Sequence, residues 1–361
     1  MEEQRRVAFV TLGCKVNTTE TEGMRNLFEA AGYRCVPADG MADVYVINTC
    51  TVTNMGDRKS RQMIRHSRAL NPDAVVAAVG CYAQVSPDEV AAVQGVDLVL
   101  GNNRKHLIVP LAEEAARMRA GLRPAESPSV EVRPRKEMTD FETLPQAAYQ
   151  GQTRAFLKIQ DGCDRFCSYC IIPYARGPVR SRKPDEILEE ARSLVARGFT
   201  EMVLTGIHLT SFRDGNGEEA LPTLIQALDQ MPGIARIRLG SLEPVFLSEP
   251  VLDVLVQSGK LCPHFHLSLQ SGSASVLKRM NRRYDPSEFA QVVASVRARF
   301  PEASITTDVM VGFPGESEEE FEESLAFCES MGFSWMHVFP YSPPCMRPLG
   351  PKAFLHKALR I

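Results

Sequence analysis

The stretch Asp161-Gly162-Cys163-Asp164-Arg165-Phe166-Cys167-Ser168-Tyr169-Cys170 brings three cysteines into one short segment. Three residues and then two residues separate successive thiols, so all three can face one side of a tight loop. Thiolates are the protein ligands of iron–sulfur clusters, and three of them on a four-iron cubane leave one iron free for another molecule. Residues Arg154–Gln160 read as a β-strand that runs directly into the loop, and Pro173 and Gly177 keep the following chain irregular. The sequence therefore predicts a cluster-binding loop at the carboxyl end of a strand.

Zinc binding and simple burial account less well for the three cysteines. A structural zinc site normally needs four ligands, and neither a second Cys-x-x-Cys pair nor a nearby histidine completes such a set here. Three buried cysteines without a metal would need an apolar segment, whereas Asp161, Asp164 and Arg165 make this one polar. The iron–sulfur interpretation is therefore favoured.

The cysteine spacing resembles that of the radical S-adenosylmethionine enzymes, and the flanking segments Leu157–Gly162 and Ile171–Gly177 are similar to their methylthiotransferase branch. The resemblance implies an enzyme, a transferase, in which the cluster held by Cys163, Cys167 and Cys170 binds S-adenosylmethionine at its open iron. One electron then cleaves S-adenosylmethionine to methionine and a 5′-deoxyadenosyl radical, so the protein positions the reactants while the cofactor reacts. A reducing electron donor is an implied partner.

Length and composition indicate a soluble protein of about two to three domains. The chain has 361 residues, of which 44% are hydrophobic, so it can bury substantial cores. No run approaches the ~18 apolar residues of a membrane span, and the charged opening Met1–Arg6 is unlike a signal peptide, so we expect a cytoplasmic location and no membrane partner. Ten cysteines in such a chain indicate metal ligands or catalysts rather than a disulfide scaffold.

The N-terminal part alternates short apolar strands with helical segments, which is the pattern of a parallel α/β sheet covered on both faces. After the first strand, Met24, Leu27 and Phe28 share one face of a predicted helix that stops at Gly32. The predicted strands are Val7–Leu12, Val44–Ile47, Val75–Val79 and Val96–Leu100.

Three further cysteines occupy equivalent places, because Cys14, Cys50 and Cys81 each lie just past the end of a predicted strand. The carboxyl ends of parallel strands line one crevice, so these thiols can meet although they are far apart in sequence. On spacing alone, three unrelated buried thiols remain an alternative. The methylthiotransferase resemblance implies a second four-iron cluster on these cysteines. It carries a sulfur that a second S-adenosylmethionine methylates before transfer to the substrate.

The second part of the chain contains six predicted βα units, which are too few for a full (β/α)8 barrel. The resemblance implies the same open-sided (β/α)6 barrel. Its predicted strands are Ala155–Ile159, Glu201–Leu204, Ile234–Leu239, His264–Leu269, Ile305–Val311 and Trp335–Pro340. The expected divisions are 1–119 for the α/β domain, 120–150 for a proline-rich linker, 151–342 for the barrel and 343–361 for an aberrant tail. The tail departs from the family, whose β-rich RNA-binding (TRAM) domain is expected to be missing.

Active sites of such barrels lie in the loops at the carboxyl ends of the strands. In these loops glycine allows close backbone approach, and polar side chains suit a ribose or an amino-acid moiety. By resemblance, Glu243 and Gln270 contact the sugar or the methionine part of S-adenosylmethionine, and Tyr169 lies near its adenine. The full set of predicted cofactor contacts is Tyr169, Gly206, Glu243, Gln270, Ser271, Gly312 and Phe313.

Three basic runs favour an RNA phosphate backbone as partner. Because the formal net charge is −3, such a surface must be local. A single charge run is more often a solvated helix face than a binding site, but three runs near the predicted active edge favour tRNA. The runs are Arg58, Arg61, Arg65 and Arg68; Arg176, Arg180, Arg182 and Lys183; and Lys278, Arg279, Arg282 and Arg283.

The segments Thr11–Asn17 and Gly80–Gln84 resemble the methylthiotransferases that act on N6-threonylcarbamoyladenosine beside the tRNA anticodon. Relatives acting on isopentenyladenosine in tRNA, or on a ribosomal-protein aspartate, usually differ around the first cysteine and are the enzymatic alternatives. A truncated, catalytically inactive iron–sulfur RNA-binding protein is the alternative from another class. The polar loops after the second to fifth barrel strands favour the enzyme.

Overall fold

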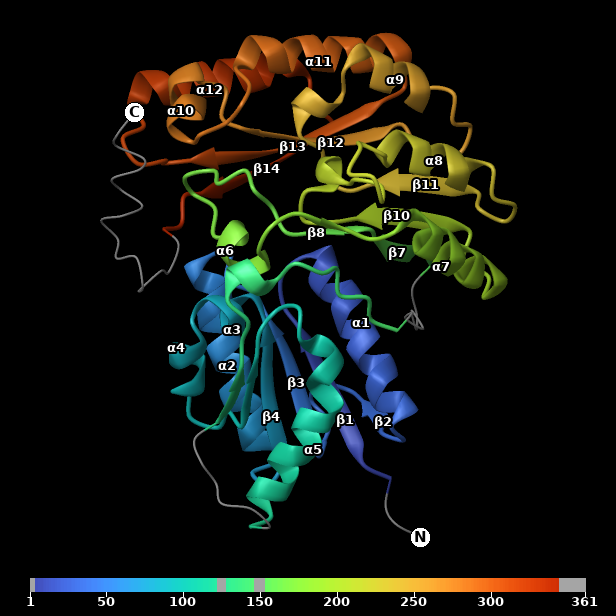
Figure 1. Cartoon of the computed structure of the whole chain (residues 1–361). Coiled ribbons are helices and arrows are strands. Elements are labelled where there is room, and N and C mark those ends of the chain that lie inside the picture. The colour runs from blue at the N-terminus through green and yellow to red at the C-terminus, as the bar shows by residue number, and fades with distance from the viewer. Residues whose placement is uncertain (1–3, 122–127, 146–152, 344–361) are drawn as a thin grey trace. The chain divides into compact units, whose positions relative to one another are not determined.

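The structure is a computed structural model in which residues 4–121, 128–145 and 153–343 are described. These residues form two compact units, and most of their elements are labelled in Figure 1. Unit 1 contains residues 4–121, 128–145, 171–178 and 343, and unit 2 contains residues 153–170 and 179–342. The segment 171–178 thus folds as part of unit 1, although it directly follows the cysteine loop of unit 2. The expected tail after residue 343 lies outside the described residues.

Unit 1 is built on one parallel sheet of six strands in the order β2-β1-β3-β4-β5-β6. Its central strands are uninterrupted apolar runs because helices cover both faces of the sheet. The parallel sheet predicted from sequence is therefore confirmed. The edge strands β2 and β6 are not predicted, since three residues are too few to show a periodic pattern. The strands are Arg6–Thr11 (β1), Arg34–Val36 (β2), Val44–Thr49 (β3), Val75–Gly80 (β4), Leu98–Leu100 (β5) and Ser129–Glu131 (β6, inside the stretch interpreted as a linker).

Alternate side chains of these strands face opposite sides of the sheet and build two separate cores. On one side Val46 packs in a core with Phe28 of α1, and on the other side Ile47 packs in a core with Ile64 of α2. Figure 1 shows the resulting three layers of unit 1. The first core is covered by α1 (Lys15–Ala30) and α5 (Ile108–Arg119), and the second by α2 (Asn54–Leu70), α3 (Cys81–Val85) and α4 (Pro87–Ala91).

The order of the sheet reverses direction between β1 and β3, because β2 lies outside β1 while β4, β5 and β6 follow β3 on the other side. In open parallel sheets, ligands bind outside the carboxyl ends of the strands at such a switch point. Cys14 follows β1, Cys50 follows β3, and Cys81 follows β4. The topology therefore places the three N-terminal cysteines where this fold class binds its ligands.

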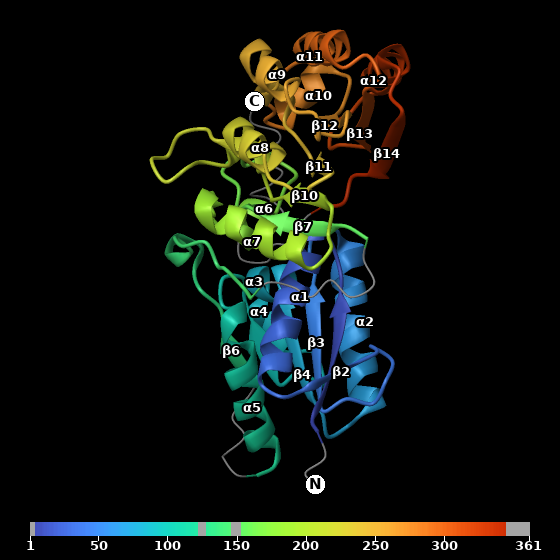
Figure 2. The same ribbon diagram turned by 90° about the vertical axis from the view of Figure 1, so that its right-hand side faces the viewer.

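Unit 2 has six parallel barrel strands in two three-stranded sheets, β11-β10-β7 and β12-β13-β14. A parallel bridge between Leu242 and Leu267 links the two sheets, so the strands run in chain order around an open arc. Figure 2 shows helices on the outside of this arc, which confirms the predicted partial barrel. The strands are Ala155–Lys158 (β7), Glu201–Thr205 (β10), Arg236–Leu239 (β11), His264–Gln270 (β12), Ser304–Val311 (β13) and Trp335–Pro340 (β14). The helices are Pro184–Ala196 (α7), Leu221–Asp229 (α8), Glu249–Leu255 (α9), Ala274–Arg279 (α10), Pro286–Arg299 (α11) and Glu318–Met331 (α12).

Local sequence fixes where the last two helices begin. At α11 the Asp285 side chain accepts from the Glu288 N–H while the Glu288 side chain accepts from the Asp285 N–H. Ser317 and Glu320 form the same reciprocal pair at α12. Each capping box satisfies two backbone donors that the first helical turn leaves open.

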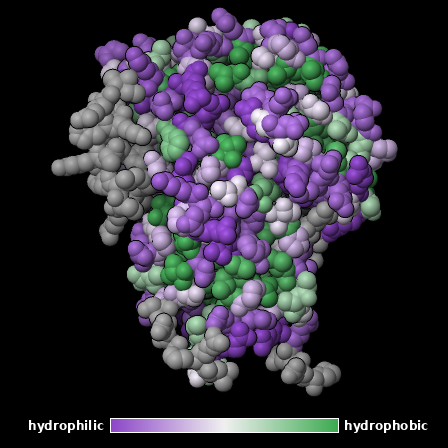
Figure 3. Space-filling view, viewed as in Figure 1, coloured by the Kyte–Doolittle hydropathy of each residue, from purple (hydrophilic) through white to green (hydrophobic). Residues whose placement is uncertain are grey.

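The described surface gives no sign of a membrane span. Among residues 4–121, 128–145 and 153–343, no helix has both the length and the apolar composition needed to cross a bilayer. On the face drawn in Figure 3, hydrophilic and hydrophobic residues are intermixed.

Candidate functional site

In unit 2, polar contacts of the Gln160 side chain hold the start of the cysteine loop. The Gln160 side chain donates to the backbone oxygens of Asp161 (2.9 Å) and Gly162 (2.7 Å) and accepts from the His208 N–H (2.7 Å). A Cβ atom on Gly206 would lie 2.9 Å from Gln160 Oε1, so only glycine fits beside this amide. The short antiparallel pair β8 (Gln160–Asp161) and β9 (Arg180–Ser181) closes the base of the loop.

The second half of the loop is tied to the end of α10. Ser168 Oγ donates to the Arg279 carbonyl (2.8 Å), and the Ser168 N–H donates to the Met280 carbonyl (3.1 Å). Asn281 Nδ2 donates to the carbonyl of Phe166 (3.1 Å), a residue with φ of +49°. These contacts hold the loop in a conformation that its own sequence does not favour, since a bulky residue rarely adopts positive φ.

The three cysteines of this loop are largely shielded from solvent, and one of them lies beside an arginine. Cys163 and Cys167 are buried, and Cys170 is half-buried. Arg282 Nη1 donates to Cys167 Sγ (3.3 Å), and its guanidinium lies 4.8 Å from the centre of the Tyr284 ring. Burial raises the pKa of Cys163 to about 11, although the N–H of Arg165 opposes the shift. Without a metal this cysteine is a neutral thiol, and metal binding must displace its proton.

Glu243 lies with His208 and Arg165 beside the loop. Its Oε2 atom is 3.0 Å from His208 Nε2 and 2.5 Å from Arg165 Nη2. Burial acts to raise the pKa of Glu243, but the His208 hydrogen bond and the nearby positive charges outweigh it and lower the pKa below the usual value. The carboxylate is therefore ionised at neutral pH and accepts hydrogen bonds. It suits the ammonium or hydroxyl groups of a cofactor.

The remaining predicted cofactor contacts lie just after barrel strands, except for Tyr169, which lies in the cysteine loop. Gln270 ends β12 with φ of +72° and is 6% exposed, and Ser271 is fully buried. Gly312, with φ of +71°, and the buried Phe313 follow β13. Burial raises the pKa of the Tyr169 hydroxyl well above its ordinary value, against the charge of Arg282. The barrel topology thus brings the predicted residues to one edge of unit 2.

In unit 1, polar side chains hold the strand ends that carry the other three cysteines. Asn17 Nδ2 donates to the carbonyls of Leu12 (2.7 Å) and Thr49 (3.1 Å), which joins the ends of β1 and β3. Thr49 Oγ1 donates to the Val79 carbonyl (2.6 Å), which joins β3 to β4. None of these polar residues stands out in the sequence, although Asn17 lies in the same short segment as Cys14.

Gly13 shows how closely the cysteines approach. Its φ is +100°, and a Cβ atom there would lie 3.0 Å from both Cβ and Sγ of Cys50. Burial raises the pKa of Cys50 to about 11, and Cys81 and Cys14 add to the shift because they are near. Cys50 thus lies against the Gly13 backbone with Cys14 and Cys81 in its surroundings, and a shared cluster on the three thiols stays a prediction.

The donor set of both trios is made of cysteine sulfurs, the ligand type of iron–sulfur clusters. In the described part of the chain, no three His, Cys, Asp or Glu side chains converge closely enough to hold one metal ion. An iron–sulfur cluster is larger than an ion, so its cysteines stand farther apart. Both trios offer sulfur, the ligand type that these clusters use.

Replacing Gly13 with alanine is expected to destabilise unit 1 and reduce its iron content. The positive φ costs about 1–3 kcal/mol for a residue with a side chain. Overpacking against Cys50 adds about 1–3 kcal/mol. Urea unfolding, and iron analysis after anaerobic reconstitution, would measure both effects.

Gly32→Ala is the matched control, because Gly32 has φ of +86° but open space where its Cβ would lie. It should show the backbone cost and full iron content. Equal losses of iron in the two variants would mean that the contact between Gly13 and Cys50 does not shape the site.

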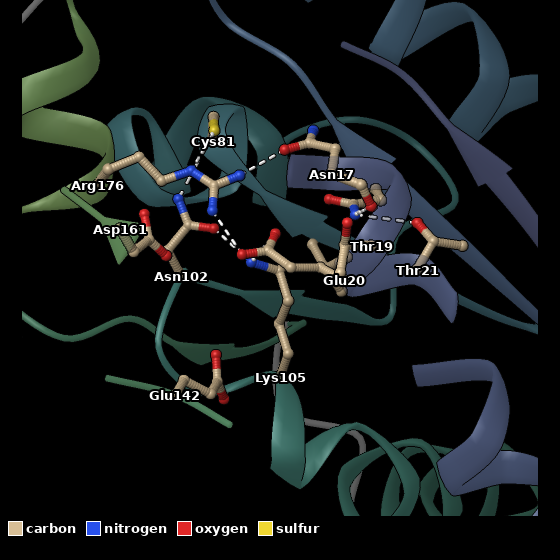
Figure 4. Close-up of polar contacts among 12 residues, drawn as sticks. Asn17, Thr19, Glu20, Thr21, Cys81, Asn102, Lys105, Glu142, Asp161 and Arg176 are labelled. Atoms are coloured by element: carbon tan, nitrogen blue, oxygen red, sulfur yellow. Dashed lines mark hydrogen bonds and ion pairs between the residues drawn. The ribbon is translucent and has the colours of Figure 1, made fainter. Parts of the chain in front are cut away.

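Buried polar residues surround Cys81, as Figure 4 shows. Arg176 Nε lies 3.2 Å from Cys81 Sγ, and Asn102 Nδ2 lies 3.7 Å from the same sulfur. Arg176 is fully buried on α6 (Ile172–Arg176), which belongs to unit 1. The sequence interpretation misses this role, because it reads Arg176 as one member of a basic run.

The interpretation of the three basic runs needs correction, because many of their side chains are buried or hydrogen-bonded within their own unit. Arg61 bonds Tyr82 and Glu89, and Arg68 bonds Gly95 and Asp97. The second run is buried except for Lys183, and in the third run Arg279 and Arg282 have partners in unit 2. The prediction that whole runs face RNA is therefore wrong. The basic side chains that remain exposed are Arg58, Lys59, Arg65, Lys183, Lys278 and Arg283.

Comparison with known proteins agrees with this architecture. Residues 157–328 match the radical SAM superfamily, and residues 6–101 match a family described as uncharacterized protein family UPF0004. The chain is 45% identical to threonylcarbamoyladenosine tRNA methylthiotransferase MtaB of Bacillus subtilis, over 93% of this chain and 73% of the relative. The chain belongs to the radical S-adenosylmethionine methylthiotransferase family. It is a transferase of this family, and the predicted cofactors, S-adenosylmethionine and [4Fe–4S] clusters, are confirmed by that membership.

Further relatives carry similar names, and one solved structure shares the fold. The protein of the same name from Aquifex aeolicus is 44% identical over 93% of this chain and 80% of its own length. A tRNA-2-methylthio-N(6)-dimethylallyladenosine synthase of Oceanobacillus iheyensis is 36% identical over 92% of this chain and 64% of its own. The radical S-adenosylmethionine methyltransferase TsrM of Kitasatospora setae matches with a TM-score of 0.66, at 16% identity, over 94% of this chain and 77% of that one. The TsrM likeness concerns the fold alone.

Proposed function

We propose that this methylthiotransferase acts on N6-threonylcarbamoyladenosine in tRNA, with one S-adenosylmethionine as radical source and a second as methyl donor. The observation that carries the proposal is the joint presence of both cysteine trios at the carboxyl ends of parallel strands. The identity of 45% to a relative named for this substrate, against 36% to one named for dimethylallyladenosine, favours the first nucleoside. A cytoplasmic location, as for other tRNA-modifying enzymes, is part of the proposal.

The roles of the residues follow from their surroundings. Cys163, Cys167 and Cys170 would hold the cluster that supplies the electron for cleaving S-adenosylmethionine. Glu243 is held as a carboxylate by His208 and orients the amino or hydroxyl groups of that molecule. Gly312 would leave room for it after β13, and Gly206, Phe313, Gln270, Ser271 and Tyr169 complete the proposed set.

The N-terminal trio Cys14, Cys50 and Cys81 would hold the second cluster, which supplies the sulfur for transfer. Gly13 lets the Cys50 sulfur lie against the backbone, and Asn17 keeps the ends of β1 and β3 together. The chain's own task here is to fix three ligands from three strands.

Nucleoside mass spectrometry of tRNA tests the substrate. Cells lacking the gene should accumulate threonylcarbamoyladenosine without the methylthio group, and cells regaining it should restore the modification. Restoration of methylthio-isopentenyladenosine instead would support the second nucleoside. No change in either nucleoside, with methylthiolation of a ribosomal protein, would replace the tRNA proposal.

The exposed face of α2 is proposed as one tRNA contact. This helix begins four residues after Cys50, and its exposed side carries Arg58, Lys59 and Arg65. Val52 (54% exposed) and Met55 (68% exposed) lie at its start and offer an apolar surface beside the cluster site. Positive side chains suit the phosphates, and apolar ones suit the face of an unstacked base.

Reversing two of these charges, with Arg58→Glu and Arg65→Glu, is expected to weaken tRNA binding. The slope of log affinity against log salt should fall by about 1 for each phosphate that the variant no longer neutralises. Filter binding or fluorescence anisotropy across a salt series would measure it.

Arg34→Glu with Arg117→Glu is the matched control, since both arginines are exposed on other elements of unit 1 and the charge change is equal. It should leave the slope nearly unchanged. If the two double variants lose affinity equally, the effect is general charge repulsion and the α2 face is not a tRNA contact.

A further inference from the structure

The short helix α6 places a charged side chain inside unit 1. Arg176, its last residue, is 0% exposed, and Lys105 and Glu20 beside it are 0% and 2% exposed. Burying charges is costly unless they are paired and hydrogen-bonded. The hydrogen-bond partners of these three side chains therefore indicate why the charges are buried here.

The guanidinium of Arg176 is held from two sides. Its Nη1 atom donates to Glu20 Oε1 at 2.5 Å, and its Nη2 atom donates to Asn17 Oδ1. Because the guanidinium is planar and rigid, these two contacts fix the direction of its third donor. That donor, Nε, lies 3.2 Å from Cys81 Sγ.

A second donor reaches the same sulfur through a connected chain of contacts. Lys105 Nζ pairs with Glu20 Oε2 (2.9 Å) and donates to Asn102 Oδ1 (2.5 Å). The Asn102 amide group thereby presents its Nδ2 atom to Cys81 Sγ (3.7 Å) and to the Ala175 carbonyl (2.8 Å). Figure 4 shows these side chains converging from α1, the loop after β5, and α6.

Two oriented N–H groups on one sulfur fit a cluster ligand. A neutral thiol is a weak acceptor, whereas hydrogen bonds to ionised acceptors are about twice as strong as neutral ones. Hydrogen bonds to ligand sulfurs also help to set the reduction potential of an iron–sulfur cluster. They stabilise the more negative, reduced state and so raise the potential.

The radical loop in unit 2 has the same kind of contact. Arg282 Nη1 lies 3.3 Å from Cys167 Sγ, and Arg282 is fixed through Tyr284 (2.9 Å). Each cysteine trio therefore has one sulfur that accepts from a buried or half-buried arginine. Because the same arginine–cysteine hydrogen bond occurs in two unrelated elements, we infer that it affects the cluster as well as the stability of the fold.

We propose that Arg176, together with Asn102, is a positioning residue for the cluster on Cys14, Cys50 and Cys81, and that its hydrogen bond to Cys81 raises the reduction potential of that cluster. The inference rests on the proposed function, because it needs a cluster at this trio. Arg176 lies six residues after Cys170, so the segment that leaves the radical loop also supplies the donor to the second cluster.

The test uses the full chain carrying Cys163→Ala, Cys167→Ala and Cys170→Ala, so that only the N-terminal trio can give a signal. After anaerobic reconstitution, a redox titration followed by electron paramagnetic resonance gives the midpoint potential. Arg176→Gln and Asn102→Asp should each make the potential more negative while iron and sulfide per chain stay at the parent level. Asn102→Asp keeps an acceptor for Lys105 but removes the donor to the sulfur and to the Ala175 carbonyl, and it adds a negative charge that shifts the potential in the same direction.

Arg68→Gln is the control, because Arg68 is another hydrogen-bonded arginine of unit 1, partly buried, that contacts Gly95 and Asp97 instead of a cysteine. It should leave the potential unchanged. Unchanged potentials in both test variants would overturn the inference and leave the proposed function standing. A parent protein without any cluster at the N-terminal trio would instead overturn the proposed function.

A measurement on the unaltered Arg176 covers the case in which its variant does not fold. Selective 15N-arginine labelling of the same parent protein should change the nitrogen couplings of the reduced cluster in pulsed electron paramagnetic resonance. The absence of any arginine nitrogen coupling would overturn the inference.

Discussion

The Cys163→Ala variant is expected to keep about half of its iron and to lose cleavage of S-adenosylmethionine entirely. Two four-iron clusters give about eight irons per chain, and each trio of thiolates holds one of them. Removing one ligand from the radical loop leaves two, which do not retain the cubane. The electron that cleaves S-adenosylmethionine comes from this cluster, so no 5′-deoxyadenosine should form. Iron and sulfide analysis, with chromatography of the products under reducing conditions, would measure both effects.

Cys328→Ala is a suitable control, since Cys328 is a buried thiol of α12 outside both trios. Its variant should hold the full iron content and cleave S-adenosylmethionine normally. If the intact protein binds zinc, or binds only about four irons, the two-cluster proposal is wrong. If Cys163→Ala loses all its iron, the two sites do not load independently.

Most strands of both units could be predicted, because a strand that is buried in the sheet has a recognisable apolar sequence. The β4 run Val75–Gly80 is apolar throughout since helices cover both of its faces. The edge strand β6 could not be predicted, because its three residues, Ser129–Glu131, lie in a proline-rich stretch and are recognised only by pairing with β5. Pairing depends on residues far away in sequence, which local patterns do not contain.

The cysteines could be picked out from the sequence, whereas the arginines around them could not. A thiol trio has a characteristic spacing, but a charged side chain can point to solvent or to the core from nearly the same helix position. Arg65 and Arg68 are three residues apart on α2, yet Arg65 is exposed and Arg68 bonds Asp97. Arg176 is hydrogen-bonded to Glu20, which lies 156 positions away in sequence, so the residues next to Arg176 do not predict its burial.

A variant with Cys14→Ala, Cys50→Ala and Cys81→Ala is expected to separate the two halves of the reaction. The residues that surround the radical loop, including Arg282 and Glu243, all belong to unit 2, so this unit should still bind and cleave S-adenosylmethionine. The sulfur for transfer has no site in this variant. We therefore expect 5′-deoxyadenosine at a rate within about threefold of the parent, a difference of under about 1 kcal/mol in barrier, and no methylthio product.

The outcome is decisive only if the variant is folded, so its unfolding by urea and its remaining iron should be measured alongside. Cysteine-to-alanine changes at Cys14 and Cys50 remove little buried volume, because Cys14 is exposed and Cys50 is half-buried. A folded variant that holds the radical cluster but no longer cleaves S-adenosylmethionine would show that the N-terminal trio takes part in radical generation. A folded variant that still transfers methylthio groups would show that the transferred sulfur does not come from a cluster on these cysteines.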